Sequence, residues 1–241
     1  MGSEAAGSGA EGLAAAVVVS GAAALREAGN QMKIDKFFSE DERERIRQAV
    51  IAAEQKTSGE IVPMIVNSSG RYMEIEMTGL TLGLVIGTLA GLTLQDPWAS
   101  IHSSLLWPLA GAVSGFLVCT IPVIKRCLIP KDRIERTVDL RSFAAFTAEG
   151  LHHTREHTGI LILISLFERR VEVLADRGIN EKVSRETWEE IVRIVTAGLK
   201  SGVPCDAFCK AIERCGEILA GHFPRAPDDT DELSNRLVTR E

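Results

Sequence analysis

The chain has 241 residues, of which 45% are hydrophobic and 25% are charged, and its formal net charge is −6. This average is typical of a globular protein, but the apolar residues are concentrated within residues 77–125. The negative charge, and the lack of a basic run interleaved with aromatic residues, argue against nucleic acid as a partner. Outside this block and the N-terminal tail, about 150 residues remain, enough for one α/β domain with its own core.

The first 31 residues differ from the rest of the chain. They are rich in Gly, Ala and Ser, and acidic residues precede their one apolar run, whereas a secretory signal needs a basic region there. Met32 begins a more ordinary N-terminal sequence. We therefore expect residues 1–31 to be a disordered tail or a mis-assigned start.

The first predicted helix begins at Ser39, which forms a capping-box pattern with Glu42. It ends near Gly59, and residues 60–66 follow as a predicted strand. Pro63 within this strand cannot donate a hydrogen bond to a neighbouring strand. This residue therefore indicates an edge position or a bulge.

A second helix and strand follow at residues 138–156 and 160–166. This strand is almost continuously apolar, so we expect it at the sheet centre, parallel to the first strand. Residues 171–175 are predicted as an antiparallel partner, and amphipathic helices at 184–200 and 205–221 complete the domain.

The predicted fold class is α/β, a helix-flanked mixed sheet interrupted by a two-helix transmembrane hairpin. The predicted boundaries are residues 32–73 and 131–224 for the discontinuous domain, 77–125 for the hairpin and 225–241 for an acidic tail.

The hairpin is predicted from two long uncharged segments. Nineteen residues separate Glu76 from Asp96, and 28 separate Asp96 from Lys125. A 19-residue helix is about 28 Å long, close to the thickness of the hydrocarbon core of a bilayer. Two buried helices of a large globular domain are the alternative, but this chain is too short to surround them. The expected partner of the hairpin is therefore the lipid bilayer.

Basic residues beside the spans predict the orientation. One precedes the first span, none lies in the turn, and five follow the second span: Lys125, Arg126, Lys131, Arg133 and Arg136. By the positive-inside rule, the domain is cytoplasmic and the chain is a multi-pass protein of the cell membrane, the inner membrane in a bacterium. The odd number of cysteines, five, agrees with a reducing compartment.

Small residues recur within both spans. In lipid, such a glycine ridge lets helix backbones approach closely, so we expect it to pack against the other helix or against a second copy of the chain. The residues are Gly79, Gly83, Gly87 and Gly91 in the first span and Gly111 and Gly115 in the second.

Recognised catalytic motifs are few. Residues 153–157 have the H-x-x-E-H form, which binds zinc when His153 and His157 share one helical face. No third ligand is evident downstream, so a solvated basic helix end is the preferred interpretation. Polar residues near strand ends form the other candidate site, a polar cleft of Asp176, Glu60 and Arg170 with Asp176 as a weak metal-binding candidate.

Several segments resemble the TPM domain family, which is named for a thylakoid lumen protein, a photosystem repair protein and a receptor modulator. The resemblance covers about residues 33–224 apart from the hairpin, and is closest to bacterial members with transmembrane helices inside the domain. It rests on residues 37–40, 57–62, 158–165, 168–171 and 175–179.

The resemblance implies a sheet sandwiched by helices. It leaves two functions open, because some members are described as acid phosphatases, some as calcium binders, and others as factors that maintain membrane complexes. The first expectation is a non-enzymatic module that binds, maintains or regulates a membrane protein complex. The alternative is a membrane-tethered phosphatase-like hydrolase, with calcium as a cofactor by resemblance alone and Asp176 as its central residue.

Overall fold

The computed structural model describes most of the chain as two units. The first contains residues 1–69 and 135–241, and the second contains residues 70–134. The expected tail of residues 1–31 lies outside the described residues apart from Val19–Ser20. The described residues are 19–20, 37–94, 101–154, 156–225 and 233–240.

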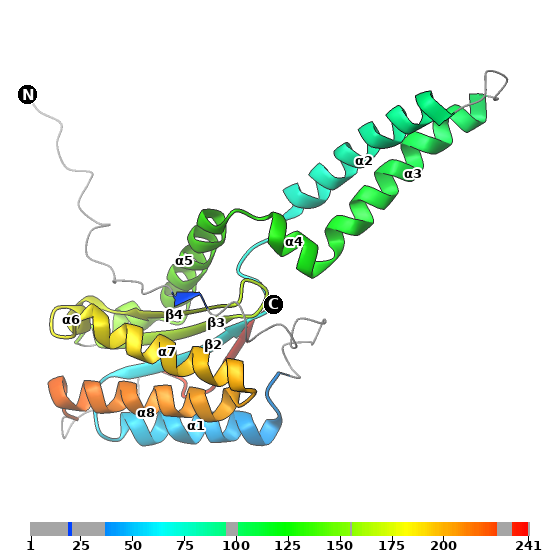
Figure 1. Cartoon of the computed structure of the whole chain (residues 1–241). Helices are drawn as coiled ribbons and strands as arrows, with labels where there is room; N and C mark the ends of the chain where they lie inside the picture. The colour runs from blue at the N-terminus through cyan, green and yellow to red at the C-terminus, as the bar shows by residue number, and fades with distance from the viewer. Residues whose placement is uncertain (1–18, 21–36, 95–100, 155, 226–232, 241) are drawn as a thin grey trace, which may run out of the picture. The chain divides into compact units, whose positions relative to one another are not determined.

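Three strands form the middle of the sheet in the first unit (Figure 1). β2 (Glu60–Val66) and β3 (Gly159–Ser165) are parallel, with Glu60 opposite Gly159. β4 (Arg170–Ala175) runs antiparallel to β3. The predicted central strand, its parallel partner and the antiparallel third strand are therefore confirmed.

Two short strands complete the sheet at its edges. β1 (Val19–Ser20) pairs antiparallel with β4, and β5 (Val238–Arg240) pairs parallel with β2, so the order is β1-β4-β3-β2-β5. Residues 225–241 are predicted only as an acidic tail, and β5 corrects this expectation. Arg240 also forms an ion pair with Glu149 at 2.5 Å, which ties the end of the chain to the domain.

The position of Pro63 has a simple explanation. The backbone amide of Glu60 donates to Thr158 beside β3, whereas that of Ile61 points the other way and donates to the buried carboxylate of Glu54. Because amide directions alternate along a strand, the nitrogen of Pro63 also points away from β3. β5 pairs with β2 only from Met64 onward, so no ladder bond is lost at Pro63.

Three helices cover one face of the sheet (Figure 1). They are α1 (Glu40–Glu54), α7 (Arg185–Ser201) and α8 (Pro204–His222), and the capping box predicted at Ser39 begins α1. Both amphipathic helices were therefore predicted within a few residues. Their apolar faces and alternate residues of the strands form the main core, which includes Trp188, Phe208 and Cys215.

The opposite face of the sheet is covered by α5 (Lys131–Ala148) and the short 3-10 helix η2 (Leu151–His153). The predicted helix over 138–156 is thus displaced toward the N-terminus. It ends early because Gly150 has a left-handed backbone, with φ +77°, which stops an α-helix.

The second unit contains α2 (Met73–Leu94), α3 (Ile101–Thr120) and the short α4 (Pro122–Leu128). Among the described residues, α2 is by itself long and apolar enough to cross a membrane. The second apolar segment passes the same test only if Leu105–Thr120 and α4 are counted as one span bent by 89°. The predicted two-span hairpin is therefore supported for its first helix and stays a prediction for its second.

The glycine ridge lies where α2 and α3 pack antiparallel. A Cβ atom added at Gly83 would lie 2.1 Å from the carbonyl oxygen of Gly111, and one at Gly87 would lie 2.3 Å from that of Trp107. A Cβ atom added at Gly79 would lie 2.6 Å from the carbonyl oxygen of Gly115 and 2.4 Å from Sγ of Cys119. The two backbones approach too closely for any larger residue at these positions.

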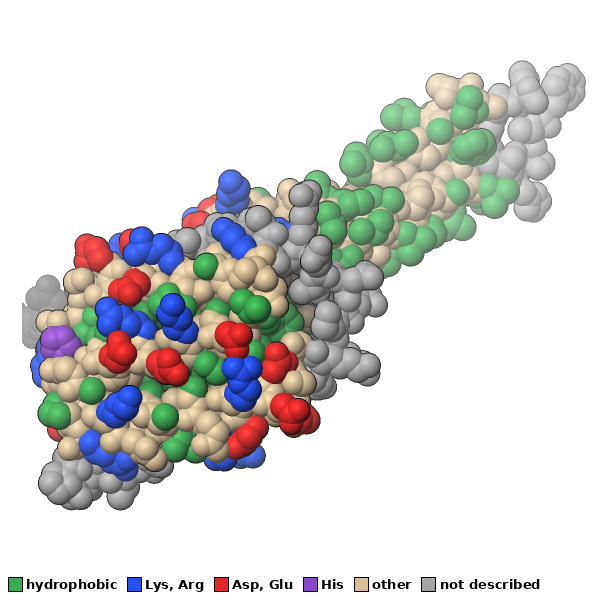
Figure 2. Space-filling view, turned by 60° about the horizontal axis from the view of Figure 1, so that its bottom comes forward, with side chains coloured by type: hydrophobic (Ala, Val, Ile, Leu, Met, Phe, Trp, Pro, Cys, Tyr) green, Lys and Arg blue, Asp and Glu red, His purple; other side chains and the backbone are tan. Residues whose placement is uncertain are grey.

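The outward side of the helix pair is apolar (Figure 2). Its exposed leucines lie on both helices, so α2 is not the buried core helix of a globular domain. The most exposed are Leu92 (76%), Leu105 (69%), Leu94 (66%), Leu106 (62%) and Leu109 (62%).

We expect Gly83→Leu to separate α2 from α3, because the new side chain would occupy the space of the Gly111 backbone. The thermal midpoint of the detergent-solubilised protein should fall by several degrees. Val85→Leu, on the exposed side of the same helix, is the matched control and should leave the midpoint unchanged. Equal midpoints for the two variants would contradict close packing through the ridge.

Candidate functional site

Asp176 lies directly after β4 and begins the short helix α6 (Arg177–Asn180). Its Oδ1 atom accepts a hydrogen bond from the backbone amide of Arg177, the first residue of this helix, at 2.6 Å. The residue is buried, with 6% of its surface exposed. Part of the reason for an acid at this position is therefore local structure.

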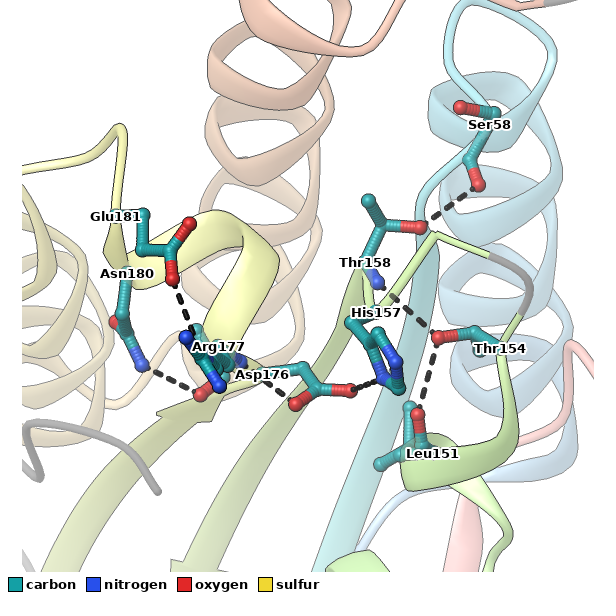
Figure 3. A network of polar contacts seen from close by, with 10 residues as sticks. Ser58, Leu151, Thr154, His157, Thr158, Asp176, Arg177, Asn180 and Glu181 are labelled. Atoms are coloured by element: carbon teal, nitrogen blue, oxygen red, sulfur yellow. Dashed lines mark hydrogen bonds and ion pairs between the residues drawn. The ribbon is translucent and has the colours of Figure 1, made fainter. Parts of the chain in front are cut away.

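The second carboxylate oxygen of Asp176 faces His157 (Figure 3). Nδ1 of His157 lies 3.4 Å from Oδ2, and 63% of the imidazole side chain is exposed. His157 has a left-handed backbone, with φ +54°, which is unusual for a residue other than glycine. The pair joins a buried carboxylate to a solvent-exposed imidazole, and it carries opposite charges whenever the imidazole is protonated.

Hydrogen bonds hold the loop that carries His157 (Figure 3). The Thr154 hydroxyl donates to the carbonyl of Leu151 and accepts from the amide of Thr158, both at 3.1 Å. The Thr158 hydroxyl donates to the carbonyl of Ser58 at 3.2 Å. These hydrogen bonds hold the loop at this end of the sheet and so fix the position of His157.

Glu60 lies at the same end of the sheet as Asp176. It begins β2 opposite Gly159, and the amide of Asp176 donates to the carbonyl of Gly159 at 2.9 Å. Ile61, the next residue, belongs to the main core, so Glu60 faces the side covered by α5 and η2. The structure thus brings Glu60 and Asp176 to the same end of the sheet and to the same face.

Arg170 lies at the opposite end of the sheet. It begins β4 opposite Ser165, six residues before Asp176, which corresponds to about 20 Å along a strand. Its guanidinium forms an ion pair with Glu135 of α5 at 2.7 Å. The three residues predicted as one polar cleft share a face of the sheet but are divided between its two ends.

A cluster of acidic side chains around Arg170 was not predicted from the sequence. Glu172 follows Arg170 on the same face of β4, and Asp139 and Ser142 lie above them on α5. Glu172 is 1% exposed, and neither of its carboxylate oxygens has a hydrogen-bond partner in the described part of the chain. The alternation of polar and apolar residues in β4 could have indicated that Glu172 shares a face with Arg170. That α5 covers this face depends on the tertiary structure and cannot be predicted from local sequence.

Burial changes the ionisation of this group. It raises the pKa of Glu172 to about 7; the Asp139 charge adds to the rise, while the Ser142 hydroxyl and Arg170 oppose it. Burial also raises the pKa of Asp139, with Glu135 adding to the effect and Arg170 opposing it. Arg170 is already paired with Glu135, so protonation of Glu172 is the simplest way to relieve the excess negative charge.

A second unpredicted cluster joins the loop after β2 to the turn after β3. Glu168 is buried and accepts hydrogen bonds from the Ser68 hydroxyl and the Ser69 amide, both at 3.0 Å. The Ser165 hydroxyl also donates to Glu168 and lies 2.9 Å from that of Ser69. This cluster fixes the residues just before the inserted helices.

The H-x-x-E-H segment does not form a helical zinc site. His153 ends η2, and His157 lies beyond the turn at Thr154, so the two histidines do not share a helical face. The described residues contain no group of three or more His, Cys, Asp or Glu side chains placed to hold a metal ion.

The TPM domain family model matches residues 117–218, which include α5, β3, β4, α6, α7 and most of α8. This segment of the chain is similar to the TPM domain. α1 and β2 lie outside the matched range, although they belong to the same core and sheet. The resemblance stated from the sequence is therefore confirmed for the domain itself.

One solved structure supports the same fold. It is the NMR structure of the BA42 protein from the psychrophilic bacterium Bizionia argentinensis, at 20% sequence identity and a TM-score of 0.53. The match covers 86% of this chain and 99% of BA42. At this identity the likeness concerns the fold alone. No curated protein matches the chain.

The buried Glu172 makes stability depend on pH. An acid whose pKa rises from 4.5 to about 7 on folding favours the folded state below pH 4.5, and this contribution is lost as pH rises to 7. We expect Glu172→Gln to remove this loss and to stabilise the protein at pH 8 by about 3 kcal/mol, at 1.36 kcal/mol per pKa unit.

Denaturant unfolding between pH 4.5 and pH 8, followed by the fluorescence of the buried Trp188, measures the effect. Glu189→Gln, at an exposed position of α7, is the control and should leave the pH dependence as it is in the wild type. A Glu172→Gln protein that kept the wild-type dependence would show that another group causes it.

Proposed function

We propose that the chain is a membrane-anchored TPM-domain protein that acts as a binding module for a membrane protein complex. The observation that carries the proposal is the exposed apolar surface of α2 and α3, inserted between two neighbouring strands of one sheet. Such a continuous apolar surface is costly in water and favourable in lipid. A TPM domain held in this way is restricted to partners at the same membrane.

The topology supports two crossings rather than one. β2 precedes α2 and β3 follows α5, yet the two strands pair along their whole length. A single crossing would leave them on opposite sides of the bilayer, whereas a hairpin returns the chain to its starting side. The basic residues that follow the second span favour the cytoplasmic side.

A role in binding, rather than catalysis, agrees with the way the polar groups of the domain are used. Asp176 caps α6, Arg170 pairs with Glu135, and Glu168 holds the loop before α2. Each of these side chains has a structural role. In addition, the ridge glycines of α2 and α3 face each other, which leaves the outward leucines for lipid or for a partner helix.

Capture from membranes tests the binding role. The full chain should stay in the membrane pellet after an alkaline carbonate wash, because its hairpin lies in the hydrocarbon core. After solubilisation in mild detergent, we expect it to bring down a defined set of membrane proteins at constant stoichiometry. Release by carbonate would refute the anchor, and recovery of the chain alone from native membranes would refute the binding role.

A phosphatase-like hydrolase is the second candidate, and the His157–Asp176 pair favours it. A buried carboxylate can orient an exposed imidazole for proton transfer, and the same edge carries Glu60. This site would serve a phosphomonoester, with calcium as the cation that family resemblance suggests.

Asp176→Asn separates this candidate from the first. Asparagine caps a helix about as well as aspartate, so the fold should survive while the charge facing His157 is lost. For a hydrolase, we expect release of phosphate from a generic phosphomonoester to fall at least 100-fold, with and without calcium. Glu181→Gln, at an exposed position nearby, is the control. No turnover by the wild-type protein would leave the binding role as the function.

A further inference from the structure

α4 belongs to the second unit but is not needed to form the hairpin of α2 and α3. It turns by 89° from α3 after Ile121, whose backbone is extended, and Pro122 occupies its first turn. Proline can begin a helix but cannot continue the hydrogen bonding of the preceding one. The bend is therefore encoded locally at these two residues, and α4 does not prolong α3.

The two sides of α4 differ in chemistry. At 100° per residue, Val123, Cys127 and Leu128 lie within one arc, while Lys125 and Arg126 lie on the other side. Val123 is 62% exposed and Leu128 is 53% exposed. Within its own unit, α4 thus leaves its apolar side uncovered.

Ion pairs fix α4 beside the start of α2. Lys125 Nζ lies 2.8 Å from Oε1 of Glu76, and both side chains are mostly buried, at 17% and 20% exposed. Arg133, just after α4, pairs with Glu74 at 2.6 Å. These four charged side chains lie at the same end of the helix pair, next to the start of α2 and after the end of α3. Between them and the turn, α2 and α3 contain only uncharged residues. The position of these charges fits the boundary between lipid headgroups and acyl chains.

We propose that α4 lies flat in this boundary layer of the bilayer, with Val123, Cys127 and Leu128 toward the acyl chains and Arg126 toward anionic headgroups. The proposal rests on the membrane hairpin of the proposed function. Lipid is the partner of α4, because α4 directly follows the exposed apolar helix α3 in the chain, its own apolar side is exposed and its other side is basic. α4 then sets the depth at which the hairpin stops.

Spin-label depth measurements test the arrangement. Cys127 is exposed, and the other four cysteines can be replaced by alanine to give a single labelling site. Variants with a single cysteine at Val123→Cys, Arg126→Cys and Leu128→Cys complete the series. Each is reconstituted into phosphatidylcholine vesicles containing phosphatidylglycerol, and depth is read from the accessibility of the label to oxygen and to a water-soluble nickel chelate.

For a flat helix, labels at 123, 127 and 128 should lie at similar depths, and the label at 126 should be shallower. If α4 instead continued a span, depth would change steadily by about 7.5 Å from 123 to 128, at 1.5 Å per residue. A steady change, or water-exposed labels at all four positions, would overturn the proposal.

Two further labels separate this outcome from failure of the proposed function. Leu89→Cys and Leu109→Cys lie on the outward surface of α2 and α3 and should be deep in the bilayer. If they are deep while α4 is water-exposed, only the proposal for α4 fails. If they are water-exposed as well, the membrane hairpin itself is wrong.

Discussion

The parallel pairing of β2 with β3 is the contact on which the rest of the structure depends. Seven residues of each strand are in register, although more than 90 residues separate them in the chain. Neither strand could be buried on both faces without the other, and the core beneath α1, α7 and α8 needs both. The inserted helices must therefore return the chain to the point from which it departed, which makes a hairpin the natural insertion.

The two faces of the sheet have different chemistry. The face toward α1, α7 and α8 is uniformly apolar, whereas the face toward α5 has polar residues at both ends. At one end, Asp176 and Glu60 lie near His157; at the other, Arg170 and Glu172 lie beneath α5. Ionic groups in a buried interface add little stability compared with apolar packing. α5 therefore packs on the more polar of the two faces of the sheet.

Local sequence patterns were enough to predict much of this fold. The capping box at Ser39, the continuous apolar run of β3 and the stripe around Trp188 each have a short-range physical cause, and the corresponding elements are present. The site was predicted less well, because a strand's ends and faces are assigned only when its partners are known. Arg170 and Asp176 are both strand-end residues in the sequence, yet they lie at opposite ends of the sheet. Glu172 was missed since its burial depends on α5, which no local pattern places above it.

The three residues of β5 have a consequence for how the protein matures. They cover the outer edge of β2 from Met64 to Val66, and they are among the last four residues of the sequence given. During synthesis this edge stays open until β5 has been made, long after β2 itself has emerged, because the two strands lie far apart in the sequence. An open strand edge is a template for pairing with other chains, and Pro63 blocks only one of its ladder positions. Aggregation of the growing chain is thus opposed first by Pro63, before β5 has been made, and then by β5 itself, which covers the strand edge.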